Sequence, residues 1–79
     1  MAEQRKKVLI TDAISEEGIA ELRRAADVDV RTNLPEADII GLIGDYDALV
    51  VRSQTKVTAD IIAAGRKLQV IARAGVGID

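Results

Sequence analysis

The sequence predicts an α/β fold built as an incomplete, doubly wound parallel sheet with the element order β-α-β-α-β-α-β. Short apolar runs rich in Val, Ile and Leu alternate with stretches whose apolar residues recur at helical spacing. The connections between them are short, which favours parallel strands joined by right-handed crossovers. Because the 79 residues contain no internal repeat, low-complexity stretch or linker, we expect one single unit over residues 1–79.

The first strand and the first helix are expected between residues 8 and 26. Residues 8–10 are consecutive apolar residues, as in a strand that is covered on both faces. Ser15 is placed as a helix N-cap, and Glu16 and Glu17 follow it at the positive end of the helix dipole. The apolar face of this helix is predicted to extend to Ala26.

The second strand and helix show a different pattern. Residues 28–32 alternate between apolar and polar, which favours a strand at the edge of the sheet. Pro35 is expected as the first residue of a helix whose apolar face spans residues 39–43. Gly44 is then expected at the C′ position of that helix.

The last elements lead to the end of the chain. Residues 48–51 are predicted to form the most buried strand. Thr58 should cap a third helix that Gly65 ends. Residues 68–72 are expected to form a fourth, buried strand that runs into a cationic loop with glycines at residues 73–77.

The composition excludes several kinds of function. The chain has neither cysteine nor histidine, so it lacks thiolate chemistry, disulfides and the commonest general base and metal ligand. Tyr46 is the only aromatic residue and the net charge is −2, which argues against nucleic-acid partners. No apolar run approaches membrane-spanning length, and the N-terminus lacks a signal segment. We therefore expect a cytoplasmic protein with no membrane partner and no metal.

The loops that follow the predicted strands carry the candidate site. In open α/β sheets, ligands bind beyond the carboxyl ends of the strands. The loops there are residues 11–13, 52–56 and 73–77, and Arg52 and Arg73 each end a strand. Arginine binds carboxylate and phosphate through two parallel hydrogen bonds, and glycine lets backbone N–H groups approach a ligand closely. These groups together suit a small anion with several charges.

Structural roles are the alternative for the same residues. Arg52 would then pair with Asp47 or Asp12, and the glycines after the last strand would only form a turn. Asp12 itself is expected to be structural or a cap, and Tyr46 to pack at a helix end. The pair Gly75-x-Gly77 lacks the third glycine of a dinucleotide fingerprint and no helix follows it, so we expect no NAD site in this chain.

At these same loops the sequence resembles a known family. Residues 8–18, 46–58 and 70–79 resemble the N-terminal part of the D-isomer-specific 2-hydroxyacid dehydrogenases, in particular the branch that acts on 3-phosphoglycerate. The most specific stretches are Arg-Ser-x-Thr-Lys-Val-Thr, which begins at Arg52, and Arg-Ala-Gly-Val-Gly, which begins at Arg73.

The resemblance implies a function for the parent protein. It implies NAD-dependent oxidation of 3-phosphoglycerate, the step that leads into serine biosynthesis, and a flavodoxin-like substrate domain of which this chain is the first part. Arg52 and Ser53 would meet the charged groups of the substrate, and Arg73 would shape the same cleft. The glycine loop would offer backbone donors to the carboxylate of the substrate. The substrate-binding residues implied in this way are Arg52, Ser53, Arg73, Gly75, Val76 and Gly77.

The resemblance also implies what these residues lack. The catalytic arginine, glutamate and histidine of the family, its Rossmann cofactor domain and the segment that completes its substrate domain all lie beyond residue 79. We therefore expect the chain alone to be a catalytically inactive part of the enzyme. We also expect a symmetric homodimer, because the missing segment would leave either an open edge at residues 68–72 or uncovered apolar faces of the sheet. Exchange of the C-terminal strand or of helices is one way to form it. A self-associating structural subdomain without ligand function, or part of another D-2-hydroxyacid dehydrogenase, remains the alternative.

Overall fold

The computed structural model describes residues 5–73 and contains a four-stranded parallel sheet with the strand order β2-β1-β3-β4. This is the beginning of the 2-1-3-4-5 order of flavodoxin-like folds, so the predicted fold class is confirmed. Strands and helices alternate as expected. The elements are β1 (Lys6–Ile10), α1 (Glu16–Ala25), β2 (Ala26–Val30), α2 (Glu36–Ile43), β3 (Ala48–Val51), α3 (Ala59–Ala64) and β4 (Val70–Arg73).

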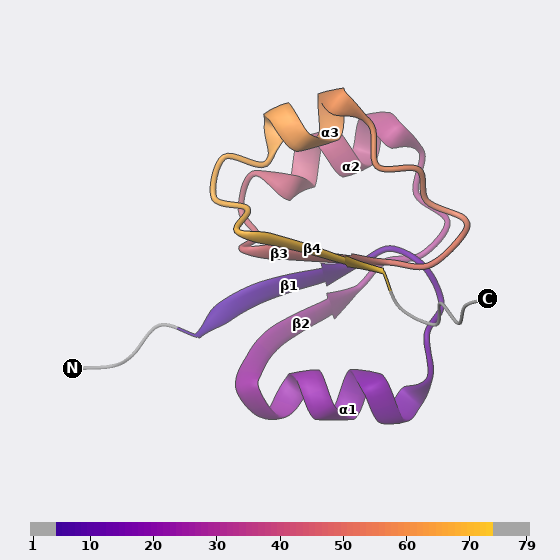
Figure 1. Ribbon diagram of the computed structural model, residues 1–79, viewed down its shortest axis with the longest axis vertical. Coiled ribbons are helices and arrows are strands. Elements are labelled where there is room, and N and C mark those ends of the chain that lie inside the picture. The colour runs from indigo at the N-terminus through magenta and orange to yellow at the C-terminus, as the bar shows by residue number, and fades with distance from the viewer. Residues whose placement is uncertain (1–4, 74–79) are drawn as a thin grey trace.

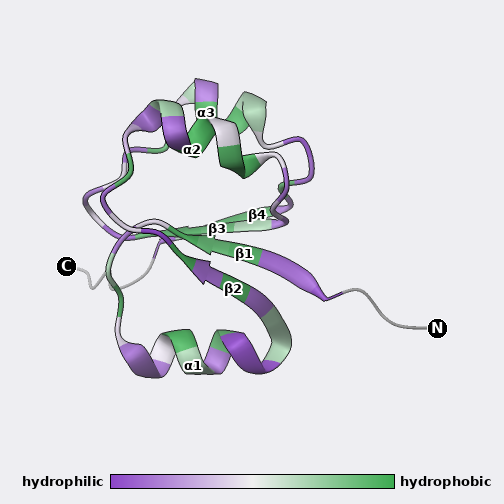
Figure 2. Ribbon diagram, turned by 180° about the vertical axis from the view of Figure 1, so that it is seen from behind, coloured by the Kyte–Doolittle hydropathy of each residue, from purple (hydrophilic) through white to green (hydrophobic). Residues whose placement is uncertain are grey.

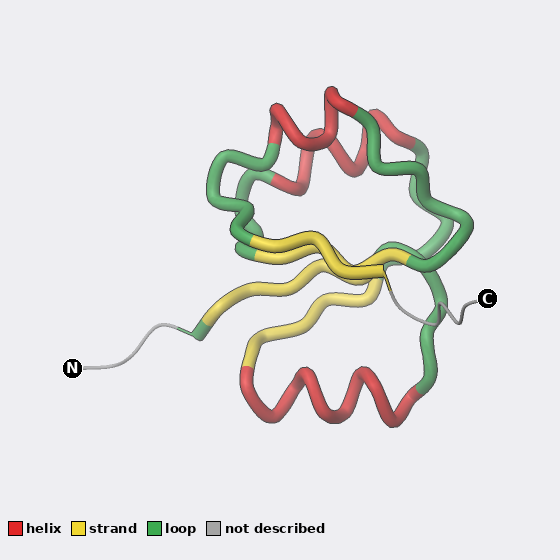
Figure 3. Tube along the Cα trace, viewed as in Figure 1, coloured by secondary structure: helices red, strands yellow, loops and turns green. Residues whose placement is uncertain are grey.

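The helices divide unequally between the two faces of the sheet. Helix α1 lies on one face, below β2 in the view of Figure 1, and α2 and α3 lie together on the other. The tube in Figure 3 shows the same three layers, and Figure 2 shows that the apolar part of the sheet comprises β3, β4 and the C-terminal half of β1. The larger core cluster lies under α2 and α3 and contains Leu9, Ile39, Ile43, Tyr46, Leu49, Val51 and Ile61. A smaller cluster on the α1 face contains Val8, Ile10, Ala26 and Val50.

Helix α1 begins as predicted but ends earlier. The Ser15 hydroxyl accepts a hydrogen bond from the Gly18 N–H at 3.1 Å, which confirms the N-cap. The expected extension of the helical face to Ala26 is wrong. Ala26 is the C-cap, its backbone is extended (φ −150°, ψ 165°), and it is already the first residue of β2. Its side chain is buried because the strand, not the helix, turns it into the core.

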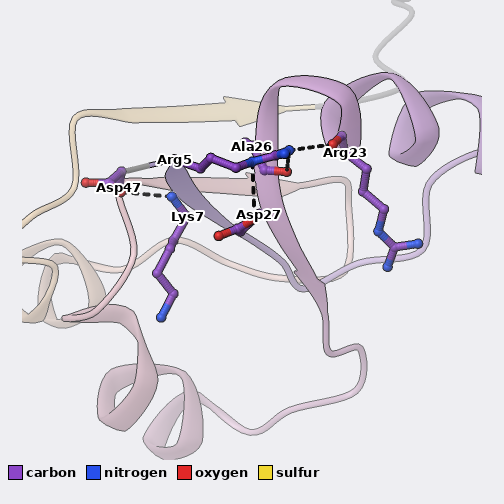
Figure 4. A network of polar contacts seen from close by, with 6 residues as sticks. All are labelled: Arg5, Lys7, Arg23, Ala26, Asp27 and Asp47. Atoms are coloured by element: carbon purple, nitrogen blue, oxygen red, sulfur yellow. Dashed lines mark hydrogen bonds and ion pairs between the residues drawn. The ribbon is translucent and has the colours of Figure 1, made fainter. Parts of the chain in front are cut away.

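Helix α1 passes into β2 without a loop, and a polar network surrounds this junction (Figure 4). Arg5 Nη2 donates to the carbonyl oxygens of Arg23 at 2.6 Å and Ala26 at 2.8 Å, and Arg5 Nε lies 3.2 Å from Asp27 Oδ1. A cation at the C-terminal end of a helix is favoured by the helix dipole and satisfies carbonyls that have no helical partner. Arg5 therefore holds the end of α1 against β1 and β2.

Helix α2 differs from the prediction at both ends by one position. Pro35 is the N-cap (φ −66°, ψ 159°) and not the first helical residue, since the helix begins at Glu36. Gly44 is the C-cap with right-handed backbone (φ −63°, ψ −17°) and not a C′ residue. At α3 the predictions are confirmed, because the Thr58 hydroxyl accepts from the Ile61 N–H and Gly65 is the C-cap.

The edge strands β2 and β4 are more exposed than the central strand β3. Strand β3 is almost fully buried and β2 lies at an edge, and both outcomes confirm the predictions. The prediction of a buried fourth strand over residues 68–72 is wrong: β4 begins at Val70 and all its residues are exposed. The physical reason is its place at the edge, since among residues 5–73 it pairs only with β3. Val70 is 54% and Ile71 39% exposed, so apolar surface lies along this edge.

Tyr46 packs just after the end of α2, as expected, and also ties the edge strand β2 to the core. Its ring is buried in the larger cluster, and its hydroxyl donates to Asp29 Oδ2 at 2.5 Å. Burial, the hydrogen bond to the Asp29 carboxylate and the charge of that carboxylate raise the pKa of Tyr46 to about 12. Within residues 5–73 no helix is long and apolar enough to cross a membrane.

Titration of Tyr46 tests this tie. Because Tyr46 is the only aromatic residue, tyrosinate absorbance near 295 nm reports it alone. We predict a midpoint near pH 12 for the folded chain and near the ordinary value of about 10 in urea. The neutral phenol is the stabilised form, so this contribution to stability is complete below about pH 10 and is lost as the pH rises toward 12. Asp29→Asn should lower the folded midpoint and Asp27→Asn should not; equal midpoints in all three proteins would contradict the tie.

Two neighbouring isoleucines test how the core is distributed. Ile61 is 1% exposed and Ile62 is 53% exposed on the same helix. We predict that Ile61→Ala lowers the free energy of unfolding by about 2–5 kcal/mol, and that Ile62→Ala changes it by about 0.5 kcal/mol or less. Urea denaturation followed by circular dichroism measures both, and similar losses for the two variants would show that α3 is packed differently.

Candidate functional site

The candidate site lies where the chain changes direction in the sheet. Strands β1 and β3 are neighbours, but the loop after β1 leads to α1 on one face and the loop after β3 leads to α3 on the other. The two loops diverge at this switch point, which is where open α/β sheets bind ligands. The loops at residues 11–13 and 52–56 therefore lie at the same rim, as expected, whereas the third predicted loop lies outside the described residues after Arg73.

Asp12 joins the two diverging loops. Its Oδ2 accepts from the Arg52 N–H at 2.6 Å and the Thr55 N–H at 2.9 Å, and its Oδ1 accepts from the Thr55 hydroxyl at 2.5 Å. The residue is 2% exposed. Burial acts to raise the pKa of this carboxyl, but the hydrogen bonds from Thr55 and Arg52 outweigh it, and the pKa lies below its ordinary value. Asp12 is structural, as expected, and is ionised at neutral pH.

Arg52 and Arg73 come together at the ends of β3 and β4. Arg73 pairs in register with Val51, the residue before Arg52, and its Nε donates to the Arg52 carbonyl oxygen at 3.1 Å. Both arginines are exposed. The alternative in which Arg52 forms an ion pair with Asp12 or Asp47 is wrong for residues 5–73. Asp12 binds its backbone N–H, and Asp47 lies at the other end of β3, where it accepts from the Lys7 N–H at 2.8 Å (Figure 4).

The other predicted site residues follow these arginines. Ser53 is exposed in the bend directly after Arg52. Gly75, Val76 and Gly77 lie outside the described residues. Their predicted role at the substrate site stays a prediction.

A cleft that the sequence interpretation missed lies on the other side of the Arg52 loop. It has a volume of about 640 Å3 and opens between the loops after β1, β2 and β3 and the first turns of α2 and α3. Its lining combines buried apolar and buried polar side chains with more exposed polar ones. The lining residues are Thr11, Asp12, Asn33, Leu34, Pro35, Glu36, Ile39, Gln54, Thr55, Lys56, Thr58 and Ile61.

Two local features mark this cleft. The Thr11 hydroxyl is buried and has no hydrogen-bond partner among the described residues. Asn33 has left-handed backbone (φ 64°), a conformation that asparagine tolerates better than most residues. The Asn-Leu-Pro sequence at residues 33–35 is typical of a turn, a signal that the sequence analysis did not use, and only the fold brings this turn beside the loops of β1 and β3.

The described residues do not fit a dinucleotide or a metal. The loops after β1, β2 and β3 contain no glycine, so their backbones offer no close approach to a pyrophosphate. Within residues 5–73 no group of histidine, cysteine, aspartate or glutamate side chains is arranged to hold a metal ion. Two exposed guanidinium groups at one rim have the chemistry to bind a small anion.

Comparison with protein families gives a match over most of the chain. A family model described as the D-isomer specific 2-hydroxyacid dehydrogenase catalytic domain matches residues 8–79. The chain belongs to this family. The resemblance inferred from the sequence is thereby confirmed.

Individual relatives of the dehydrogenase family are much longer than this chain. It is 53% identical over 73 residues to D-3-phosphoglycerate dehydrogenase of Synechocystis sp., a match that covers 92% of this chain and 13% of that protein. It is 42% identical over 76 residues to hydroxypyruvate reductase of Thermotoga maritima, covering 95% and 25%. The crystal structure of the PH0520 protein from Pyrococcus horikoshii OT3 superposes with a TM-score of 0.86 at 29% identity, covering 96% of this chain and 23% of that one.

Proposed function

We propose that the chain supplies the substrate-anion site of an NAD-dependent dehydrogenase that oxidises 3-phosphoglycerate in serine biosynthesis. One observation carries the proposal: Arg52 and Arg73 are exposed side by side at the carboxyl ends of β3 and β4, and neither guanidinium has a carboxylate partner among residues 5–73. The similarity to proteins named D-3-phosphoglycerate dehydrogenase supports the choice of substrate.

The charges of the substrate match this rim. 3-Phosphoglycerate carries a carboxylate and a phosphate, and each of these groups accepts two parallel hydrogen bonds from a guanidinium. Two neighbouring guanidinium groups repel each other when no anion lies between them, so a bound anion relieves that repulsion. Ser53 would add a hydroxyl donor, and the backbone of Gly75, Val76 and Gly77 would complete the proposed site.

Catalysis is proposed to need residues outside this chain. Oxidation of the substrate hydroxyl removes a hydride, which NAD accepts in the proposed reaction, and a proton, which needs a general base. The chain contains no histidine, and its described loops do not form a dinucleotide site. Its own residues would bind and orient the anion, and the chain alone would be inactive.

Two other proposals have specific support. The similarity to a hydroxypyruvate reductase favours a related 2-hydroxy acid that lacks phosphate. The apolar residues Val70 and Ile71 along the edge of β4 favour self-association of the chain into a homodimer.

Anion binding tests the proposed site. We predict that 3-phosphoglycerate shifts the amide signals of residues 52–55 and 73 in NMR titrations. Arg52→Gln should weaken binding by about tenfold or more, because a charge-assisted hydrogen bond contributes about 1.5–3 kcal/mol. Arg66→Gln makes the same charge change before β4, at the opposite end of the sheet, and should leave the affinity within about twofold.

A parallel titration with glycerate separates the substrates. Weaker binding of glycerate supports the phosphate as a recognised group, and equal binding favours the 2-hydroxy acid without phosphate. Shifts that are absent, or that spread evenly over all arginines, would contradict a site at this rim.

Light scattering tests the homodimer. We predict twice the mass of one chain at high micromolar concentration. Val70→Lys should give the monomer mass, because a lysine on an edge strand opposes pairing with another strand. Ile62→Lys places the same charge on an equally exposed residue of α3 and should leave the dimer intact. A monomeric wild-type chain would remove this proposal.

A further inference from the structure

The backbone of Arg52 is held by side chains from both neighbouring strands. Its N–H donates to Asp12, which follows β1, at 2.6 Å, and its carbonyl oxygen accepts from Arg73 Nε, at the end of β4, at 3.1 Å. Since β3 lies between β1 and β4, the hydrogen bonds of Asp12 and Arg73 reach the Arg52 backbone from opposite sides. The Arg52 guanidinium is not held in this way, because its contact with the Ala13 carbonyl oxygen is long, at 3.4 Å.

The Asp12 carboxylate binds the loop after β3 through both of its oxygens. Both oxygens accept hydrogen bonds from the loop of residues 52–55, and the residue is almost completely buried. A buried carboxylate with well-made hydrogen bonds fixes its donors more firmly than a neutral acceptor does. The loop therefore has one defined arrangement before any ligand arrives.

We propose that Asp12 is a positioning residue of the anion site, which fixes the backbone of residues 52–55 so that Arg52 stands beside Arg73. This inference rests on the proposed function, because it requires that Arg52 contacts the anionic substrate. Asp12 does not touch the anion itself. It acts by reducing the conformational freedom that Arg52 loses when the anion binds.

The proposal predicts an effect opposite in sign to that of simple electrostatics. A negative charge near an anion site repels the ligand, so charge alone predicts tighter binding when the Asp12 charge is removed. Positioning predicts weaker binding when the hydrogen bonds are removed. Asp12→Asn and Asp12→Ala both remove the charge, but only Asn keeps the shape, an oxygen that accepts from both N–H groups and an amide that can donate to the Thr55 hydroxyl.

The experiment compares the wild-type chain, Asp12→Asn and Asp12→Ala. The affinity for 3-phosphoglycerate is measured by NMR titration, and the exchange rate of the Arg52 amide hydrogen is measured on the same samples. We expect Asp12→Ala to weaken binding by about tenfold, equivalent to about 1.4 kcal/mol, and to speed Arg52 exchange. Asp12→Asn should bind within about threefold of wild type. A folded Asp12→Ala chain that binds as tightly as wild type, or more tightly, overturns the inference.

A second pair of variants keeps the test available if Asp12→Ala does not fold. Thr55→Val removes the hydroxyl that donates to Asp12 Oδ1, and Thr55→Ser keeps it. We expect Thr55→Val to weaken binding and Thr55→Ser to retain it, and equal affinities for the two would overturn the inference. If the wild-type chain does not bind 3-phosphoglycerate at all, the proposed function fails and the positioning role fails with it.

Discussion

The buried carboxylate of Asp12 is the contact on which the functional end of this sheet depends. The chain leaves β1 and β3 toward opposite faces of the sheet, so the loops after these two strands diverge. Asp12, in the loop after β1, connects the two loops through three hydrogen bonds to the loop after β3. Burying a carboxylate is costly unless its hydrogen bonds are satisfied, and the lowered pKa of Asp12 indicates that these hydrogen bonds more than offset its burial.

The rest of the structure positions the Asp12 contact beside the proposed anion site at Arg52 and Arg73. The larger core under α2 and α3 contains side chains of β1 and β3, whereas β2 and β4 are the edges of the described sheet and each pair with one strand. Arg5 and Tyr46 secure the β2 edge through polar contacts, and Arg73 connects the β4 edge to the Arg52 loop. For the proposed anion site, a fixed backbone at this rim reduces the conformational freedom that Arg52 loses when the anion binds.

Much of the fold could be predicted from the sequence because its signals are local. Ser15, Thr58 and the apolar run of β3 determine where elements begin and which strand is central. The exposure of β4 could not be predicted in this way. An apolar pair such as Val70 and Ile71 occurs both in covered strands and in edge strands, and only the order of the strands decides between them. Arg52 and Arg73 were identified from the rule for strand ends, but the cleft beside Asn33 depends on how three loops meet, which no single segment encodes.

Direct titration of the Asp12 carboxyl carbon by NMR tests the central claim. The folded chain should show a pKa below the ordinary aspartate value of about 3.9. Because the pKa is depressed in the folded state, the stabilisation by Asp12 is present above the unfolded value and is lost as the pH falls through the folded one. Thr55→Val should raise this pKa by removing one donor. An Asp12 that titrates at or above the ordinary value in the folded chain would contradict the account.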